Sequence, residues 1–229
     1  MRAVDVAELA AVIDQTLLKP TVGFNEGAKW IEANRGCGFA ALCVSPFLVP
    51  VAAQRLAGTP TEVCSVCGFP LGYLNTETKA EEAATLVDLG CAEVDMVLNI
   101  AALLEKEESF VQDDIRAVVR AVTEHSEGTA LVKVILETGY LEEDDIRRGC
   151  TLAIAAGARY VKTSTGFGPR GASVRDVEVM RAEVGEDFGV KAAGGIRDVE
   201  TALQMIEAGA DRLGTSSGAE ILDAYAARV

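Results

Sequence analysis

Two lysines, Lys162 and Lys191, have both the residue type and the setting for chemistry. Each ends a short apolar run, in GARYVKTSTGFG and in GVKAAGGIRD, and glycine or hydroxyl residues follow closely. A buried charge is costly unless it is paired or used. A lysine held near a second cation in a partly dry pocket loses some of its proton affinity and becomes a nucleophilic amine, the usual route to a Schiff base. The first hypothesis is therefore an enzyme.

Further charged residues fall late in neighbouring apolar runs and extend this pattern. Asp95, Lys133, Lys162 and Lys191 lie in four consecutive runs, and strand alternation places Glu93 on the face of Asp95 and Glu137 on the face of Lys133. Adjacent strands would bring these side chains into one cluster. An internal ion-pair network with no further role is the alternative, but buried ion pairs stabilise a fold poorly compared with apolar residues, so we favour a functional site.

The elements that must position this cluster repeat one unit of strand, turn and helix. About eight strands are expected, namely Ile13 to Gln15, FAALCV, EVCSVC, EVDMVL, LVKVIL, ARYVK, GVKA and DRLG, with segments of helical period between them. This alternation predicts parallel strands joined by right-handed crossovers. We expect one domain over residues 1–229, an α/β fold of the (β/α)8 TIM barrel type with an extra N-terminal helix. An open doubly wound sheet is the second choice.

Composition excludes several other classes of protein. The net charge of -14 argues against a nucleic acid partner, because neutralising a phosphate backbone needs clustered Lys and Arg. The most apolar stretch, residues 39–53, is too short to span a bilayer and contains Pro46 and Pro50, so we expect no membrane span. Asp5 and Glu8 interrupt the N-terminal segment where an export signal would be apolar. A cytoplasmic protein with reduced cysteines is expected.

The cysteines and the single histidine do not favour a metal site. Cys64 and Cys67 have CxxC spacing, but in a strand an offset of three residues points them to opposite faces. There is no second CxxC, and His125, the only histidine, follows a helical stretch. We interpret Cys64 and Cys67 as packing residues and His125 as a surface residue.

Glycine and serine residues follow the last three strands. In a barrel, late loops of this kind hold phosphate groups with backbone N–H groups and helix N-termini. The candidates are Gly166, Gly194, Gly195, Gly214, Ser216 and Ser217. A phosphorylated small molecule is the expected substrate.

Motifs along nearly the whole chain resemble the deoxyribose-phosphate aldolase family of class I, Schiff-base-forming aldolases. They are IDQTLLKPT, ALCVSPFLVPVA, VCGFPLGYLNTETKAEEA, EVDMVLNI, VKVILETGYL, YVKTSTGFGPRGA, VKAAGGIRD and LGTSSG. The resemblance implies a (β/α)8 barrel that reversibly cleaves 2-deoxy-D-ribose 5-phosphate to D-glyceraldehyde 3-phosphate and acetaldehyde, in deoxyribose phosphate catabolism. It also implies that no metal or cofactor takes part, and it leaves a homodimer and a homotetramer open.

The resemblance assigns a role to each matching position. It implies that Lys162 forms the Schiff base, that Lys191 lowers the pKa of that lysine and exchanges protons, and that Asp95 is a proton donor and acceptor. Residues around the bound substrate match Lys133, Asp14, Thr16 and Cys43, while the phosphate site matches Gly166, Gly194, Gly195, Gly214, Ser216 and Ser217.

Two positions depart from the family pattern. Gln15 stands where many members have histidine, and Phe167 stands where some have lysine after the glycine. The second change leaves Arg170, Arg197 or backbone amides alone to hold the phosphate. Two other functions remain as alternatives: a phosphosugar isomerase, which would need a Glu or His base and no amine, and a phosphate-binding barrel without catalysis.

Overall fold

The computed structural model describes residues 5–228, in which eight parallel strands form a closed barrel. The strands are β1 (Ile13–Leu17), β2 (Ala41–Val44), β3 (Glu62–Cys67), β4 (Glu93–Val97), β5 (Leu131–Ile135), β6 (Tyr160–Lys162), β7 (Gly189–Ala193) and β8 (Arg212–Thr215). Each pairs with the next in chain order, and β8 pairs with β1. The expected barrel is confirmed, and the open-sheet alternative is wrong.

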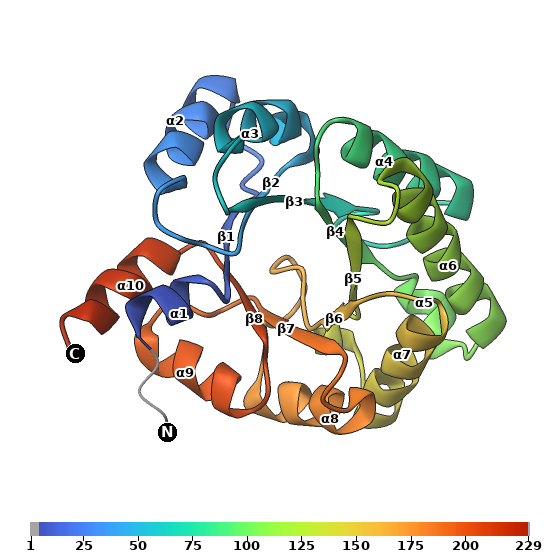
Figure 1. The fold of residues 1–229 in the computed structure, drawn as a ribbon. Helices are drawn as coiled ribbons and strands as arrows, with labels where there is room; N and C mark the ends of the chain where they lie inside the picture. Colours follow the sequence, from blue (N-terminus) through green and yellow to red (C-terminus); the bar gives the residue numbers. More distant parts are fainter. Residues whose placement is uncertain (1–4, 229) are drawn as a thin grey trace.

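Helices surround the barrel, as Figure 1 shows. They are α2 (Phe24–Asn34), α3 (Val49–Leu56), α4 (Thr76–Asp88), α5 (Ile100–Leu104), α6 (Glu108–His125), α7 (Glu143–Ala155), α8 (Val174–Val184), α9 (Val199–Glu207) and α10 (Gly218–Ala226), with short 3-10 turns η1 (Pro46–Leu48) and η2 (Thr138–Tyr140). Within residues 5–228, no helix is both long and apolar enough to cross a membrane.

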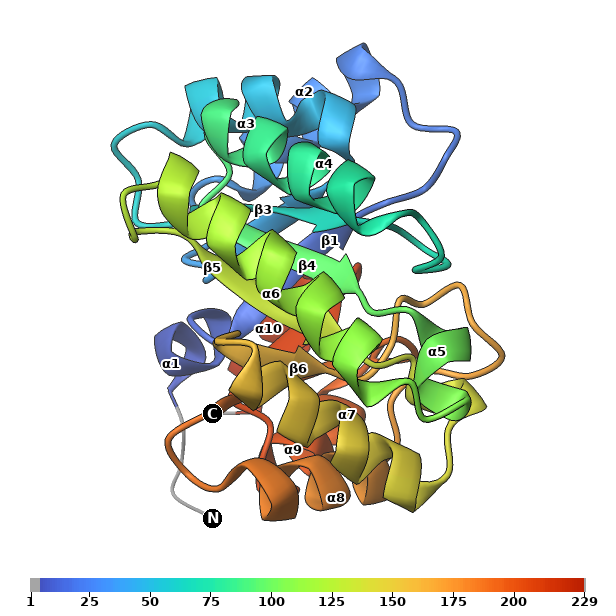
Figure 2. The same cartoon turned by 90° about the vertical axis from the view of Figure 1, so that its right-hand side faces the viewer.

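The expected N-terminal helix is α1 (Val6–Ala10), which precedes β1. Asp5 and Glu8 form a capping box that satisfies N–H groups at its start. α1 packs against α10, and Figure 2 places it at the end of the barrel opposite the β3–α4 and β6–α8 loops.

The outer and inner faces of the strands line two different interiors, because successive side chains point to opposite faces. The main apolar core lies between the strands and the helices, where residues such as Val94, Val134 and Val161 are fully buried. Inside the barrel, the apolar residues form only a small second cluster, Ala41, Cys43, Cys64 and Val66. Much of the remaining interior is charged, and this is unusual enough to need an explanation.

Candidate active site

Within residues 5–228, seven charged side chains meet inside the barrel. They are Asp14, Glu93, Asp95, Lys133, Lys162, Lys191 and Arg212. Glu93 and Arg212 are the first residues of β4 and β8, whereas Lys162 is the last residue of β6. The cluster therefore extends along the barrel from the start of the strands to their carboxyl ends, where TIM barrels carry their active sites.

Asp95 is the centre of this cluster. Its Oδ2 accepts hydrogen bonds from Lys162 Nζ and Lys191 Nζ, both at 2.7 Å, and its Oδ1 accepts one from Lys133 Nζ at 2.9 Å. Lys162 and Lys191 are also direct partners in the β6–β7 register. Because both amines share one oxygen, their nitrogen atoms are no farther apart than twice 2.7 Å.

Two further carboxylates hold the other cations in place. Asp14 Oδ2 accepts from Lys191 Nζ, and its Oδ1 accepts from Arg212 at 2.6 Å. Glu93 Oε2 lies 2.6 Å from Lys133 Nζ and 3.2 Å from Arg212. Lys133 and Lys191 thus each contact more than one carboxylate, whereas the only ion pair of Lys162 among residues 5–228 is with Asp95.

The cluster is held in its charged form by its own ion pairs. Burial alone would raise the pKa of Asp95, but Lys133, Lys162 and Lys191 outweigh it and hold that pKa well below its usual range. Burial alone would lower the pKa of Lys191, but Asp14 and Asp95 raise it above the ordinary lysine value. Lys191 is therefore protonated beside Lys162 before any substrate binds.

The charges in the cluster do not balance when every lysine is protonated. Lys133, Lys162, Lys191 and Arg212 are four cations, and Asp14, Glu93 and Asp95 are three carboxylates. In a low-dielectric interior, an unbalanced charge is unfavourable. The cluster becomes neutral if one lysine loses its proton, and Lys162 is the one held by the fewest carboxylates.

A cavity of about 570 Å³ opens at the carboxyl end of the barrel and reaches Lys162. Thr16 and every residue expected at the phosphate site line it: Gly166, Gly194, Gly195, Gly214, Ser216 and Ser217. The backbone N–H groups of Gly166, Gly194, Gly195 and Ser216 have no hydrogen-bond partner in the part of the chain that the structure describes. Such N–H groups at a cavity wall are suited to an anion.

The two arginines considered for the phosphate differ in their partners. The Arg170 guanidinium is engaged by both oxygens of Asp176 and by the Thr138 carbonyl. Arg197 lines the cavity, is exposed and has no ion pair within residues 5–228. Lys19, from the loop after β1, lines the same cavity. Among the described residues that line the cavity, the cations without an ion pair are therefore Arg197 and Lys19, whereas Arg170 is paired with Asp176.

Phe167 contacts another loop at the mouth of the barrel. Its ring packs edge-on against Phe69, with the ring centroids 5.5 Å apart. Phe69 belongs to the β3–α4 loop and Phe167 to the β6–α8 loop. Where a lysine would add charge, this chain has an aromatic contact between two loops.

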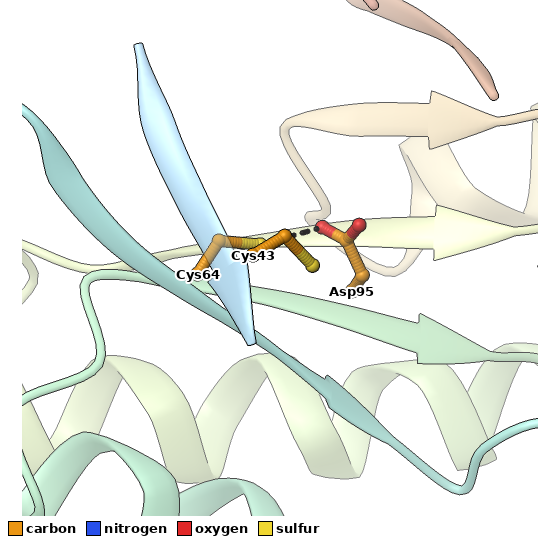
Figure 3. Close-up of side chains that lie close together, drawn as sticks. All are labelled: Cys43, Cys64 and Asp95. Atoms are coloured by element: carbon orange, nitrogen blue, oxygen red, sulfur yellow. Dashed lines mark hydrogen bonds between the residues drawn. The ribbon is translucent and has the colours of Figure 1, made fainter. Parts of the chain in front are cut away.

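Cys43 and Cys64 lie on adjacent strands and face Asp95 (Figure 3). The Cys64 thiol lies 3.4 Å from Asp95 Oδ1. Together with Asp95 they have the spacing of a metal site, as do Asp14, Cys64 and Glu93. However, the Lys133 ammonium lies 3.5 Å from Cys64 Sγ, and burial raises the pKa of that thiol well above its usual value. A cation beside an ammonium and a protonated thiol is unfavourable, so these donors do not fit a metal.

Most of the residues expected from the sequence lie in the cluster or the cavity. Glu137 is an exception: its backbone has left the strand with a φ of 58°, and its carboxylate binds Thr165 instead of a lysine. His125 is exposed beside Asp88, as expected, and Cys67 packs outside the barrel against α4. Arg212 and the polar contacts of Cys64 were not predicted, although Arg212 shares the inward face of β8 with Gly214.

Comparison with known proteins agrees with this arrangement. The sequence pattern of the DeoC/LacD family aldolases matches residues 11–224. Deoxyribose-phosphate aldolase of Bacillus subtilis is 50% identical over 214 residues, which are 93% of this chain and 94% of that protein. The enzyme of the same name from Caldanaerobacter subterraneus is 49% identical over 217 residues, covering 95% and 93% of the two chains.

Solved structures agree with the sequence comparison. An aldolase named QR15 superimposes with a TM-score of 0.90 at 38% identity and covers 100% of this chain and 98% of its own. A tetrameric deoxyribose phosphate aldolase from Aeropyrum pernix gives a TM-score of 0.88 at 31% identity, covering 98% and 94%. With its barrel, its lysine cluster and these relatives, the chain belongs to the DeoC/LacD family of aldolases.

Proposed function

We propose that this chain is a deoxyribose-phosphate aldolase that works through a Schiff base on Lys162. The observation that carries the proposal is the position of that amine. Lys162 is the one lysine of the cluster that lines the cavity, and it is the surplus cation beside the protonated Lys191. Repulsion by Lys191 favours the neutral amine, which is the form that attacks a carbonyl.

In the first stage, neutral Lys162 Nζ attacks the C1 aldehyde of open-chain 2-deoxyribose 5-phosphate. A carbinolamine forms, one hydroxyl leaves as water, and a protonated imine remains. The leaving hydroxyl needs a proton, and we assign its supply to Lys191, whose Nζ lies 2.7 Å from the Asp95 oxygen that also binds Lys162. Asp95 accepts and returns protons between these steps.

In the second stage, the C2–C3 bond breaks. The C3 hydroxyl loses its proton to a base, C3 becomes the aldehyde of glyceraldehyde 3-phosphate, and the electron pair of the broken bond moves into the imine to give an enamine. Protonation of the enamine at C2 gives the imine of acetaldehyde, and water releases acetaldehyde and regenerates Lys162. We assign the proton transfers to Asp95 and Lys191, with Lys133, Asp14, Thr16 and Cys43 around the substrate.

We propose that the phosphate binds to the glycine and serine residues of the last loops, which line the same cavity as Lys162. The N–H groups of Gly166, Gly194, Gly195 and Ser216, unpaired within residues 5–228, and the hydroxyls of Ser216 and Ser217 supply donors. Gly214 leaves room for the Lys191 side chain, since a Cβ there would lie 3.1 Å from Lys191 Cε. Arg197 adds the charge that Phe167 does not provide. This reading uses no metal and no cofactor, and it leaves the isomerase and non-catalytic alternatives without a supporting observation.

The remaining expectations are part of the same proposal. We infer a single-domain enzyme that assembles as a homodimer or homotetramer, in line with the tetramer described for the relative from Aeropyrum pernix. We also infer a cytoplasmic location, which suits six cysteines that are all free thiols.

Borohydride trapping tests the proposal. The protein is incubated with acetaldehyde and sodium borohydride, digested, and analysed by peptide mass spectrometry, with Lys162→Met as the control. A two-carbon label on the peptide that contains Lys162, absent in Lys162→Met, is expected together with cleavage of 2-deoxyribose 5-phosphate by the unmodified enzyme. A label on another lysine, or full activity in Lys162→Met, contradicts the assignment.

A further inference from the structure

Gln15 lies outside the charged cluster, yet it is almost completely buried, at 2% exposure. It follows Asp14 in β1, so its side chain points out of the barrel, toward α2 and α10. Its Oε1 accepts a hydrogen bond from the Gly218 backbone N–H at 2.9 Å, and its Nε2 donates to Asn34 Oδ1 at 3.2 Å. Asn34 is held in turn by the Trp30 carbonyl at 2.8 Å.

This contact occurs at the start of α10, where the chain leaves the proposed phosphate site. The first N–H groups of a helix have no partner within the helix and usually bind the side chain of the N-cap residue. Ser217 is the N-cap of α10, but its side chain makes no capping bond. Gln15, from the other end of the sequence, takes the Gly218 N–H instead.

Because Gln15 accepts the hydrogen bond from the Gly218 N–H, the Ser217 side chain does not have to cap the helix. The Ser217 N–H donates to Thr215 Oγ1 at 2.9 Å, and its hydroxyl has no partner in the described residues while it lines the cavity. A Cβ on Gly218 would lie 2.7 Å from Gln15 Oε1 and 3.0 Å from both Ile13 and Phe39. The start of α10 is therefore fixed closely by β1 and its surroundings.

We propose that Gln15 is a positioning residue for phosphate recognition, an inference that rests on the proposed function. By capping α10 from β1, it holds Ser216 and Ser217 at the cavity with their hydroxyls available to the phosphate. Its hydrogen bonds within residues 5–228 are to Asn34 and Gly218, and none is to Lys162, Lys191 or Asp95. The inference thus predicts an effect on the phosphorylated part of the substrate and little effect on bond cleavage.

The test compares 2-deoxyribose 5-phosphate with 2-deoxyribose, the same sugar without its phosphate. For each variant, the ratio of kcat/KM for the two substrates is measured. Gln15→Met keeps the size of the side chain but removes both hydrogen bonds, and it is expected to lower this ratio about tenfold. Gln15→His is expected to stay within about twofold of the unmodified enzyme, since a neutral imidazole has one donor and one acceptor.

A matched control separates positioning from general destabilisation. Ser65→Ala removes another buried side-chain hydrogen bond, from Ser65 Oγ to the Val44 carbonyl at 2.8 Å, on the outer face of β3. It is expected to lower the unfolding temperature without changing the ratio. If Gln15→Met does not fold, Asn34→Ala is measured in its place, because it removes the hydrogen bond that supports the Gln15 amide. The ratio of the two kcat/KM values is then expected to fall by about twofold or more.

The outcomes separate this inference from the proposed function. An unmodified enzyme that does not cleave 2-deoxyribose 5-phosphate overturns the proposed function itself. If the unmodified enzyme is active but Gln15→Met lowers both kcat/KM values equally, or leaves both unchanged, Gln15 does not position the phosphate site. If Gln15→Met fails to fold and the ratio is unchanged in Asn34→Ala, Gln15 likewise does not position the phosphate site.

Discussion

Replacing Lys191 with methionine tests whether its charge keeps the attacking amine neutral. The two ammonium nitrogens each lie 2.7 Å from one oxygen of Asp95, so their separation is at most twice that distance. Two unit charges about 5 Å apart at an effective dielectric constant of about 20 repel each other by about 3 kcal/mol. A difference of about 3 kcal/mol between the two protonation states of one group moves its titration by about 2 pH units.

Methionine also makes the cluster neutral with Lys162 protonated, because three cations then face three carboxylates. The pH profile of kcat/KM for 2-deoxyribose 5-phosphate is the assay, recorded from pH 5 to 10. For Lys191→Met, we expect the acidic limb to move upward by about 2 pH units, so that activity near pH 7 falls about 100-fold and partly recovers at higher pH.

A second variant separates charge from proton transfer. Lys191→Arg keeps the cation and should keep the position of the acidic limb, even where its larger side chain lowers the rate. Circular dichroism and thermal unfolding establish that both variants are folded. If Lys191→Met loses activity by the same factor at every pH, the charge of Lys191 does not control Lys162, and the electrostatic reasoning is refuted.

Three further predictions concern the carboxylates and the phosphate. Asp95→Asn should lower kcat by a factor of about 10² to 10⁴, measured by coupled detection of glyceraldehyde 3-phosphate; an unchanged kcat argues against proton transfer by Asp95. Arg197→Ala should raise KM for the phosphorylated substrate about tenfold, whereas Arg170→Ala should mainly lower the unfolding temperature, since Arg170 is bound to Asp176; equal KM values contradict this distinction. The pKa of Asp14 is lowered in the fold because Lys191, Lys133 and Arg212 outweigh the effect of burial. Its stabilisation is therefore present above about pH 4 and lost as the pH falls. In urea unfolding from pH 5 to 2, Asp14→Asn should reduce the pH dependence by up to about 1.4 kcal/mol per pH unit, and an unaltered slope refutes the charge assignment.

Much of the barrel could be predicted because each strand carries its own local signal. The run EVCSVC coincides with β3 in full, and the charged residues of β4 to β7 lie on the inward face that alternation predicts. Glu137 shows where this reasoning ends. Strand alternation applies only while the backbone stays extended, and the left-handed φ at Glu137 turns its carboxylate toward Thr165.

The contacts that could not be predicted from the sequence join residues that are far apart in the chain. Gln15 and Gly218 are 203 positions apart, and their hydrogen bond depends on the closure of the barrel between β1 and β8. Arg212 lies in the expected strand DRLG two positions before Gly214, so strand alternation could have placed it inside the barrel. The resemblance to the aldolase family showed that Gln15 departs from the family pattern. It did not identify the hydrogen-bond partners of the Gln15 amide, because a residue type alone does not fix the positions of the neighbouring groups.

The packing of α1 on α10 has a practical consequence for handling the enzyme. α10 begins beside the cavity and packs against α1, which Figure 2 shows at the end of the barrel away from the β3–α4 and β6–α8 loops. An affinity tag, a fused partner or a solid support joined ahead of α1 or behind α10 would therefore be attached on the side remote from substrate entry. Immobilised particles prepared through either end should present the open mouth of the barrel to the solution.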